Sequence, residues 1–320
     1  MIFQTFITVV ALVLLFVFSI HKFSRQIERV AGERLRSLLK KLTNNPVLGA
    51  GVGTVITSIL QSSAATLVVS VGLVNAGILT FYGSLGVVFG ANIGTTITSQ
   101  LIALNVIALA PFVVILGFIL LKFGGKYSVY GKSVFYFGLV FLCISLISQI
   151  VAPLAVNDTI IELFSKVTSL PMTILLGIAL TVLFQSSSIT SGLILVLAGS
   201  GLLSFYQGVG LMLGANIGTT STVLLAVLPM GIEAKKTAVA HLMFNLLGLI
   251  IILPFLKPLS SVVHFIGGNT AVQIANMHLI FNLLSTVIFL IFLQPFIKLI
   301  EWIATTRLMH VHVDVNIQSK

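Results

Sequence analysis

Two long stretches of the sequence contain no aspartate, glutamate, lysine, arginine or histidine. They run over 42–121 and 167–232 and are 80 and 66 residues long. A helix needs about 20 apolar residues to cross a bilayer, so each stretch has room for about three crossings, or for a mixture of crossings and re-entrant hairpins. The chain is 58% hydrophobic and 8% charged, against about 25% charged residues in soluble proteins. The sequence therefore predicts an all-α integral membrane protein.

The positive charges gather in short connectors between the apolar segments. Seven of the 17 lysines and arginines lie between Lys22 and Lys41. Such clusters are typical of cytoplasmic loops, and they account for the net charge of +10 without a nucleic-acid partner. We expect a multi-pass protein of the cell (inner) membrane, with the N-terminus outside and the C-terminus in the cytoplasm.

Hydropathy and charge divide the chain into six segments. We predict a first transmembrane helix at 1–20, a cytoplasmic amphipathic basic helix at 21–44, a first repeat at 45–121, a second repeat at 131–256, a final transmembrane helix at 275–300 and a cytoplasmic tail at 301–320. The basic helix has apolar residues at helical spacing, which predicts an anchor lying in the lipid interface. The tail contains HVHVDV, whose histidines could bind metal, but we expect a disordered tail.

The two repeats are related by a constant offset of 124 residues. The motif GANIGTT occurs at 90–96 and again at 214–220, and 17 of 36 residues are identical between 61–96 and 185–220. The matches include glutamine, asparagine and glycine, which chance similarity between apolar segments would not produce. The first repeat begins at cytoplasmic lysines and the second at a loop expected outside. The copies therefore run in opposite directions, and we predict an inverted repeat, the construction of many secondary transporters.

Each repeat carries two groups of polar, uncharged residues inside its apolar stretch. The sequence is QSSAAT at 61–66 and QSSSIT at 185–190, each followed by an asparagine and threonines. Hydroxyl and amide oxygens suit Na⁺, while hydroxyl and backbone N–H groups can donate to an oxyanion. If the helices break at these motifs, their new N-termini would add positive dipole ends. Since neither stretch contains an acidic residue or histidine, coupling to Na⁺ fits better than coupling to protons.

Helix packing is the alternative explanation for the small residues. We assign this role to the glycine pairs Gly49/Gly53, Gly86/Gly90 and Gly210/Gly214, which have small-xxx-small spacing, but not to the glutamine–serine motifs. A His-x-x-Phe-Asn pattern occurs twice, at His241 and His278, and we expect it to form structural hydrogen bonds between helices. An intramembrane Ser–His hydrolase is disfavoured because no acid is available to orient a histidine, so we do not expect an enzyme.

At these motifs the sequence resembles the type II Na⁺/phosphate cotransporter family, including its bacterial members. The resemblance covers about residues 45–295. It implies a Gln-Ser-Ser motif on a re-entrant helical hairpin in each repeat, with both motifs meeting around phosphate at the midplane. The implied phosphate-binding residues are Ser62, Ser63, Ser186, Ser187 and Ser188. The expected sodium-binding or supporting residues are Gln61, Thr66, Asn92, Thr95, Thr96, Gln185, Thr190, Asn216, Thr219 and Thr220.

The resemblance implies a sodium-coupled symporter that imports inorganic phosphate by alternating access. Its partners would be phosphate, Na⁺ as the coupling ion and the lipid bilayer; no other cofactor or metal and no nucleic acid are expected, and a homodimer is left open. The first motif has Ala64 where relatives often have a third serine, so one hydroxyl contact would be missing. The alternatives are a Na⁺-coupled carrier of another oxyanion, such as sulfate or arsenate, and an anion channel.

Overall fold

The computed structural model describes residues 2–42, 45–103, 109–167 and 169–304, and these residues form helices with no strand. The α-helices are α1 (Ile2–Leu42), α2 (Pro46–Leu60), α3 (Ser63–Asn75), α4 (Phe81–Ala103), α5 (Ala110–Phe123), α6 (Ser128–Val151), α7 (Asp158–Ser165), α8 (Leu170–Phe184), α9 (Ser187–Gly199), α10 (Phe205–Gly218), α11 (Thr220–Ala226), α12 (Ile232–Ile252), α13 (Leu256–Ile266), α14 (Thr270–Ile291) and α15 (Leu293–Ile303). Short 3₁₀ turns, η2 (Gly125–Tyr127), η3 (Ala152–Val156) and η4 (Leu253–Phe255), join some of them. HVHVDV and most of the predicted tail lie outside the described residues.

Six helical stretches of the described chain are long and apolar enough to cross a bilayer. They are Gln4–Val30, Phe81–Ala103, Ser128–Val156, Phe205–Ala226, Ile232–Ile266 and Thr270–Ile291. Many large apolar side chains are exposed at the surface, which is the arrangement expected where lipid surrounds a protein. The prediction of an all-α integral membrane protein is confirmed.

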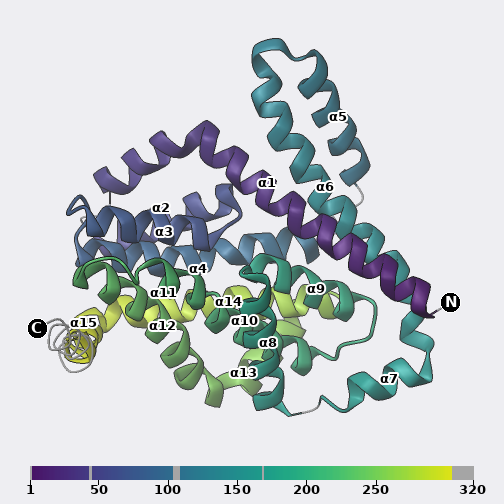
Figure 1. Cartoon of the computed structure of the whole chain (residues 1–320). Coiled ribbons are helices and arrows are strands. Elements are labelled where there is room, and N and C mark those ends of the chain that lie inside the picture. The colour runs from purple at the N-terminus through teal and green to yellow at the C-terminus, as the bar shows by residue number, and fades with distance from the viewer. Residues whose placement is uncertain (1, 43–44, 104–108, 168, 305–320) are drawn as a thin grey trace, which may run out of the picture.

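Helix α1 joins two segments that the sequence analysis separates. It continues from Ile2 to Leu42 through the boundary predicted between 1–20 and 21–44, and it bends along its length (Figure 1). The sequence HKFSRQIE around this boundary contains neither glycine nor proline, so nothing there breaks the helix. The basic segment is thus an extension of the first predicted span.

The predicted final helix at 275–300 is divided in the structure. Helix α14 begins earlier, at Thr270, and ends at Ile291, and α15 follows from Leu293. Pro295 has no backbone N–H and cannot donate to the carbonyl of Ile291, so the helical hydrogen bonding is interrupted at this point.

Glycines let the helices of each repeat approach closely. A Cβ atom added to Gly90 would lie 1.9 Å from the carbonyl oxygen of Ala50, and one added to Gly214 would lie 2.0 Å from that of Ile174. Helices α2 and α4 therefore touch through their backbones, and α8 and α10 do the same. This confirms the packing role predicted for the glycine pairs.

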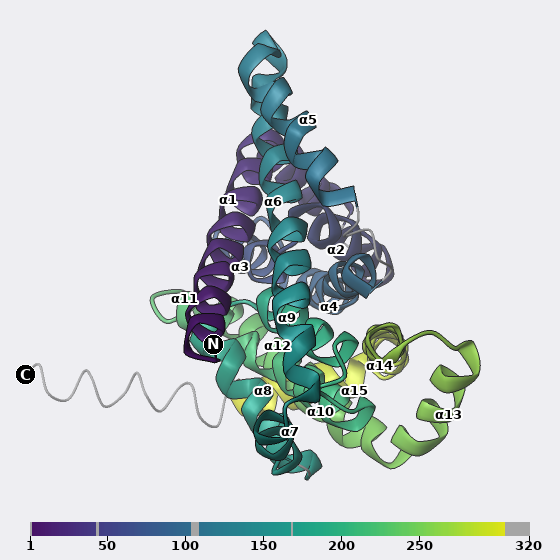
Figure 2. The same cartoon turned by 90° about the vertical axis from the view of Figure 1, so that its right-hand side faces the viewer.

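Helix α5 and the first part of α6 form an antiparallel pair that projects from the other helices (Figures 1 and 2), and the side-chain amide of Gln26 in α1 donates to the carbonyl of Val129 in α6 at 3.3 Å. The remainder of α6 lies beside α1, whose other neighbours are α2, α3 and α9. The polar motifs of both repeats lie in the main body, between α1 and the helices of the second repeat.

Candidate functional site

Each glutamine–serine motif forms the break between two short helices. In the first repeat, α2 ends at Leu60 and α3 begins at Ser63; in the second, α8 ends at Phe184 and α9 begins at Ser187. At 13 to 15 residues each, these helices are about 20–22 Å long, shorter than the roughly 30 Å hydrocarbon core. The structure therefore contains a helical hairpin with its polar motif at the tip in each repeat.

The two glutamines hold the hairpin tips in the same way. Gln61 and Gln185 are left-handed, with φ of 53° in both, an uncommon conformation for a residue other than glycine. The side-chain amide of Gln61 donates to the carbonyl of Ser58 at 2.6 Å, and its Oε1 accepts from Thr98 at 2.7 Å. The corresponding contacts of Gln185 are Val182 O at 2.8 Å and Thr222 at 2.9 Å. The contacts are related by the same offset of 124 residues as the sequence repeat.

The serines after each glutamine lie at the N-terminus of the hairpin's second helix. Ser62 accepts a bond from the backbone N–H of Ala65 at 3.2 Å, whereas Ser186 makes no capping bond. Ser63 and Ser187 are the first residues of α3 and α9, and both are buried. Because the first N–H groups of a helix lack intrahelical partners, each tip presents donors and a positive dipole end.

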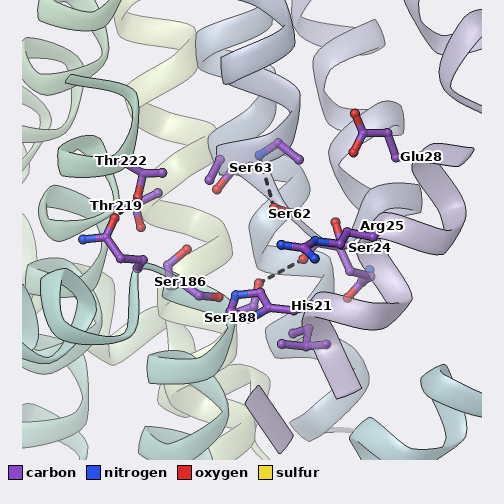
Figure 3. Close-up of a pocket in the computed structure, with 16 residues that line it drawn as sticks. His21, Ser24, Arg25, Glu28, Ser62, Ser63, Ser186, Ser188, Thr219 and Thr222 are labelled. Atoms are coloured by element: carbon purple, nitrogen blue, oxygen red, sulfur yellow. Dashed lines mark hydrogen bonds between the residues drawn. The ribbon is translucent and has the colours of Figure 1, made fainter. Parts of the chain in front are cut away.

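The two hairpin tips meet across one cavity. The Ser188 hydroxyl, at the position that corresponds to Ala64, donates to the backbone carbonyl of Gln61 at 3.3 Å. The cavity has a volume of about 320 Å³ and is shown in Figure 3. Its lining includes all five serines predicted to bind phosphate: Ser62, Ser63, Ser186, Ser187 and Ser188.

Helix α1 supplies the charged part of the cavity lining. His21, Ser24, Arg25 and Glu28 line it, and Figure 3 shows Arg25 pointing toward the serines of the two tips. The segment is predicted from the sequence to be an anchor in the lipid interface, and none of the predicted site residues is cationic. Its helical spacing indicates that His21, Arg25 and Glu28 share one face, but the sequence alone does not show that this face meets the hairpins.

The predicted sodium-binding or supporting residues are only partly gathered here. Gln61, Gln185 and Thr219 line the cavity. The others lie away from it: Thr66, Thr190, Asn92, Thr95, Thr96, Asn216 and Thr220. Thr57 and Thr181 donate to Thr66 and Thr190 at 3.0 and 2.9 Å, inside their hairpins. Thr95 and Thr96 donate to carbonyls of their own helix, α4, whereas Thr219 and Thr220, at the junction of α10 and α11, donate to carbonyls of α10.

The asparagines of the two GANIGTT motifs and the histidines of the two His-x-x-Phe-Asn patterns are buried and do not line the cavity. The Asn92 amide donates to the carbonyl of Val88 at 2.8 Å. His278 of α14 contacts Ser99 of α4 at 3.2 Å and Asn216 of α10 at 2.9 Å, so the hydrogen bonding between helices predicted for this histidine is confirmed. Among the described residues, neither ring nitrogen of His241 has a partner, so the same prediction is wrong for this histidine. The described chain also contains no cluster of three His, Cys, Asp or Glu side chains that could hold a metal ion.

The fold and the cavity define a class of protein: a multi-helix membrane protein in which two broken hairpins from a duplicated sequence enclose one polar cavity, as in secondary transporters. The model of the Na⁺/Pi-cotransporter family matches residues 15–149 and 153–292. The chain therefore belongs to the Na⁺/Pi-cotransporter family, a family of transporters and not of enzymes.

Relatives of several kinds are similar to the chain. The uncharacterized protein YqeW of Bacillus subtilis is 31% identical over 273 residues, which are 84% of this chain and 89% of YqeW. The putative inorganic phosphate export protein YjbB of Salmonella typhimurium is 27% identical over 81% of this chain. The matched part is about half (48%) of the length of YjbB. The sodium-dependent phosphate transport protein 2C of Mus musculus is 43% identical over 84 residues, 25% of this chain and 14% of that protein. No solved structure matches the chain.

Proposed function

We propose that the protein is a sodium-coupled symporter that carries inorganic phosphate across the membrane, and that the cavity between the two hairpin tips is its phosphate site. The observation that carries the proposal is the convergence of two helix N-termini, five serines and Arg25 on one cavity. Phosphate is a compact anion with several acceptor oxygens, and such donors complement it. The family match and the names of the relatives support phosphate as the substrate.

Arg25 supplies a positive charge, which the phosphate-binding residues predicted from the sequence lack. A phosphate bound by uncharged donors alone would lose much of its hydration without a fixed counter-charge, and this is costly inside a membrane. A guanidinium has five donors in a planar fork that matches phosphate oxygens. We assign Arg25 to contact phosphate together with Ser63 and Ser187, the serines at the starts of α3 and α9.

Sodium would act at the oxygens that support the hairpin tips. Gln61, Gln185 and Thr219 line the cavity and offer neutral oxygen ligands, the type that suits Na⁺. A cation bound there would favour phosphate through its charge and would stabilise the tip geometry. Each ion would thus raise the affinity of the site for the other, which couples the binding of the two.

Alternating access would expose this cavity to each side in turn. Apart from Ile20, its α1 lining lies within the basic segment at 21–44 that is predicted to be cytoplasmic, so we assign the described conformation to the state open toward the cytoplasm. Import follows if the Na⁺ gradient points inward. Export is the second candidate direction, because the YjbB relatives are named as putative phosphate export proteins.

The decisive experiment is labelled phosphate transport by proteoliposomes under a Na⁺ gradient, compared with an equal K⁺ gradient. Uptake and efflux are both recorded. The Ser63→Ala/Ser187→Ala double variant is compared with Ser261→Ala, which changes an exposed serine outside the cavity. We expect concentrative, Na⁺-dependent transport in the wild type and in Ser261→Ala, and none in the double variant.

The same vesicles separate the alternatives. Unlabelled sulfate and arsenate added in excess identify another oxyanion as the preferred substrate if they compete better than phosphate. Transport that never concentrates phosphate would indicate a channel. Phosphate transport indifferent to Na⁺, or unaffected by the two serine substitutions, would refute the proposal.

A further inference from the structure

The second hairpin borders an apolar cavity that the first hairpin lacks. The cavity measures about 400 Å³ and lies between α8, α9 and α10, with α7 at one end. The corresponding groove of the first hairpin retains only about 20 Å³. The two linings match at the offset of 124 residues, which pairs Leu180 with Ile56, Phe184 with Leu60, Thr190 with Thr66 and Leu193 with Val69. One groove is therefore filled and its counterpart is open.

The second half of α1 fills the first groove. Leu39 is 1% exposed and packs with Ile56, Leu60 and Val87. At the same offset, residues 34–41 of α1 correspond to 158–165, which are the bounds of α7. In the second repeat this element only borders the cavity, through Phe164, so within the described part of the chain no helix takes the place that α1 has in the first groove.

The chemistry of the second groove selects an apolar occupant. The lining contains no charged residue, and its polar side chains are already hydrogen-bonded. Thr173 donates to the carbonyl of Leu170 at 2.8 Å, Thr190 accepts from Thr181 at 2.9 Å, and the Gln207 amide donates to Phe164 O and Val167 O at 2.9 Å each. A polar ligand would find few partners and would lose its own hydration.

The shape and surroundings of the groove identify the source of the occupant. Its lining on α8 runs from Thr173 to Phe184, about 16 Å along the helix axis. Leu175 and Leu183 of the same helix are 65% and 74% exposed, so the helix faces hydrocarbon. A long, narrow, apolar groove bordering hydrocarbon matches a lipid chain.

We propose that the groove between α8, α9 and α10 binds one acyl chain of a membrane phospholipid, with its headgroup near α7. The surface of α7 suits a headgroup, because Glu162 and Lys166 form an exposed ion pair of 3.1 Å there. The far end of the chain touches Phe184 and Thr190, on either side of the Gln185–Ser186 break. The lipid thus supports the second hairpin as Leu39 supports the first.

Two measurements on the whole chain test the proposal. The first counts phospholipid molecules retained by the detergent-purified protein, using native mass spectrometry. The variant Leu193→Trp places a larger side chain in the groove, and Leu183→Trp makes the same change on the exposed face of α8. The second maps photo-crosslinks from a phosphatidylethanolamine with a diazirine in its acyl chain, in vesicles of phosphatidylethanolamine and phosphatidylglycerol.

We expect the wild type and Leu183→Trp to retain one phospholipid and Leu193→Trp to lose it. Crosslinks in the wild type should include groove residues such as Leu180 and Leu193, and not only exposed residues of α8. A wild type without retained phospholipid and without crosslinks in the groove would overturn the proposal, as would unchanged retention in Leu193→Trp.

The crosslinking map of the wild type decides the question even if Leu193→Trp fails to fold. Detergent found in the groove, with no phospholipid crosslink there in vesicles, would mean an adventitious additive only and would also overturn it. The proposal does not rest on phosphate transport, because neither measurement uses phosphate.

Discussion

Replacing Arg25 with glutamine gives the sharpest test of the cavity as an anion site. The substitution removes one positive charge from the lining and keeps a polar, although shorter, side chain. A hydrogen bond between a charged group and its partner contributes about 1.5–3 kcal/mol. Since about 1.4 kcal/mol is tenfold in affinity, we expect the apparent Kd for phosphate to rise about 10- to 150-fold.

The matched control is Arg34→Gln, on the same helix and with the same change in net charge. Arg34 is exposed and does not line the cavity. It lies nine residues from Arg25, about 13 Å along the helix, and the Debye length in physiological salt is about 8 Å. Its removal should therefore leave the apparent Kd within about twofold of the wild-type value.

Arg25→Lys separates charge from geometry. Lysine keeps the positive charge but loses the planar fork that contacts two oxygens at once, so we expect an effect between those of the wild type and Arg25→Gln. The assay is equilibrium binding of labelled phosphate to purified protein at fixed Na⁺, with the KM of vesicle transport measured in parallel. An unchanged Kd in Arg25→Gln would refute the assignment of Arg25 to the phosphate site.

Two further predictions concern the hairpin tips and the packing behind them. Ser188→Ala removes the long hydrogen bond of 3.3 Å to the carbonyl of Gln61. Because a neutral hydrogen bond contributes about 0.5–1.5 kcal/mol, the temperature of thermal unfolding should shift by only a few degrees, while the affinity for phosphate falls. Equal phosphate affinities of the variant and the wild type would contradict the role of this serine. Gly90→Ala places a Cβ atom 1.9 Å from the carbonyl oxygen of Ala50, whereas the Cβ atom of Gly51→Ala meets nothing within 4 Å. We expect a marked loss of thermal stability in detergent only for Gly90→Ala. Equal stability of the two variants would show that α2 and α4 can separate without cost.

The sequence predicts the architecture well because its signals are local and repeated. Charge-free stretches mark the membrane region, and polar motifs at a constant offset mark the two hairpin tips. The five serines predicted to bind phosphate do line one cavity, although their binding of phosphate stays a prediction. The duplicated Gln-Ser-Ser motif identifies these five serines as site residues even when the tertiary contacts are not known.

The contribution of α1 could not be predicted in the same way. Basic residues at helical spacing indicate an amphipathic helix, but not whether its polar face meets lipid headgroups or a protein cavity. Arg25 lies in the segment predicted to be an interfacial anchor, and only the packing of α1 against the hairpins places it at the site. Similarly, Thr66 and Thr190 were expected near sodium, whereas each is hydrogen-bonded to another threonine inside its hairpin.

The two glutamines, which share the same left-handed φ of 53°, differ in how far they are exposed at the surface. Gln61 is 8% exposed, whereas Gln185 is exposed. If the proposed alternating access of an inverted repeat holds, the difference in exposure would reverse when the carrier opens to the other side, and it would therefore report which side is open. The single cysteine of the sequence, Cys143, is buried. A water-soluble thiol reagent would therefore report a cysteine introduced at either glutamine position with little reaction at Cys143. If adding Na⁺ and phosphate lowers the thiol reactivity at position 185 and raises it at position 61, the two loops have exchanged their exposure to water.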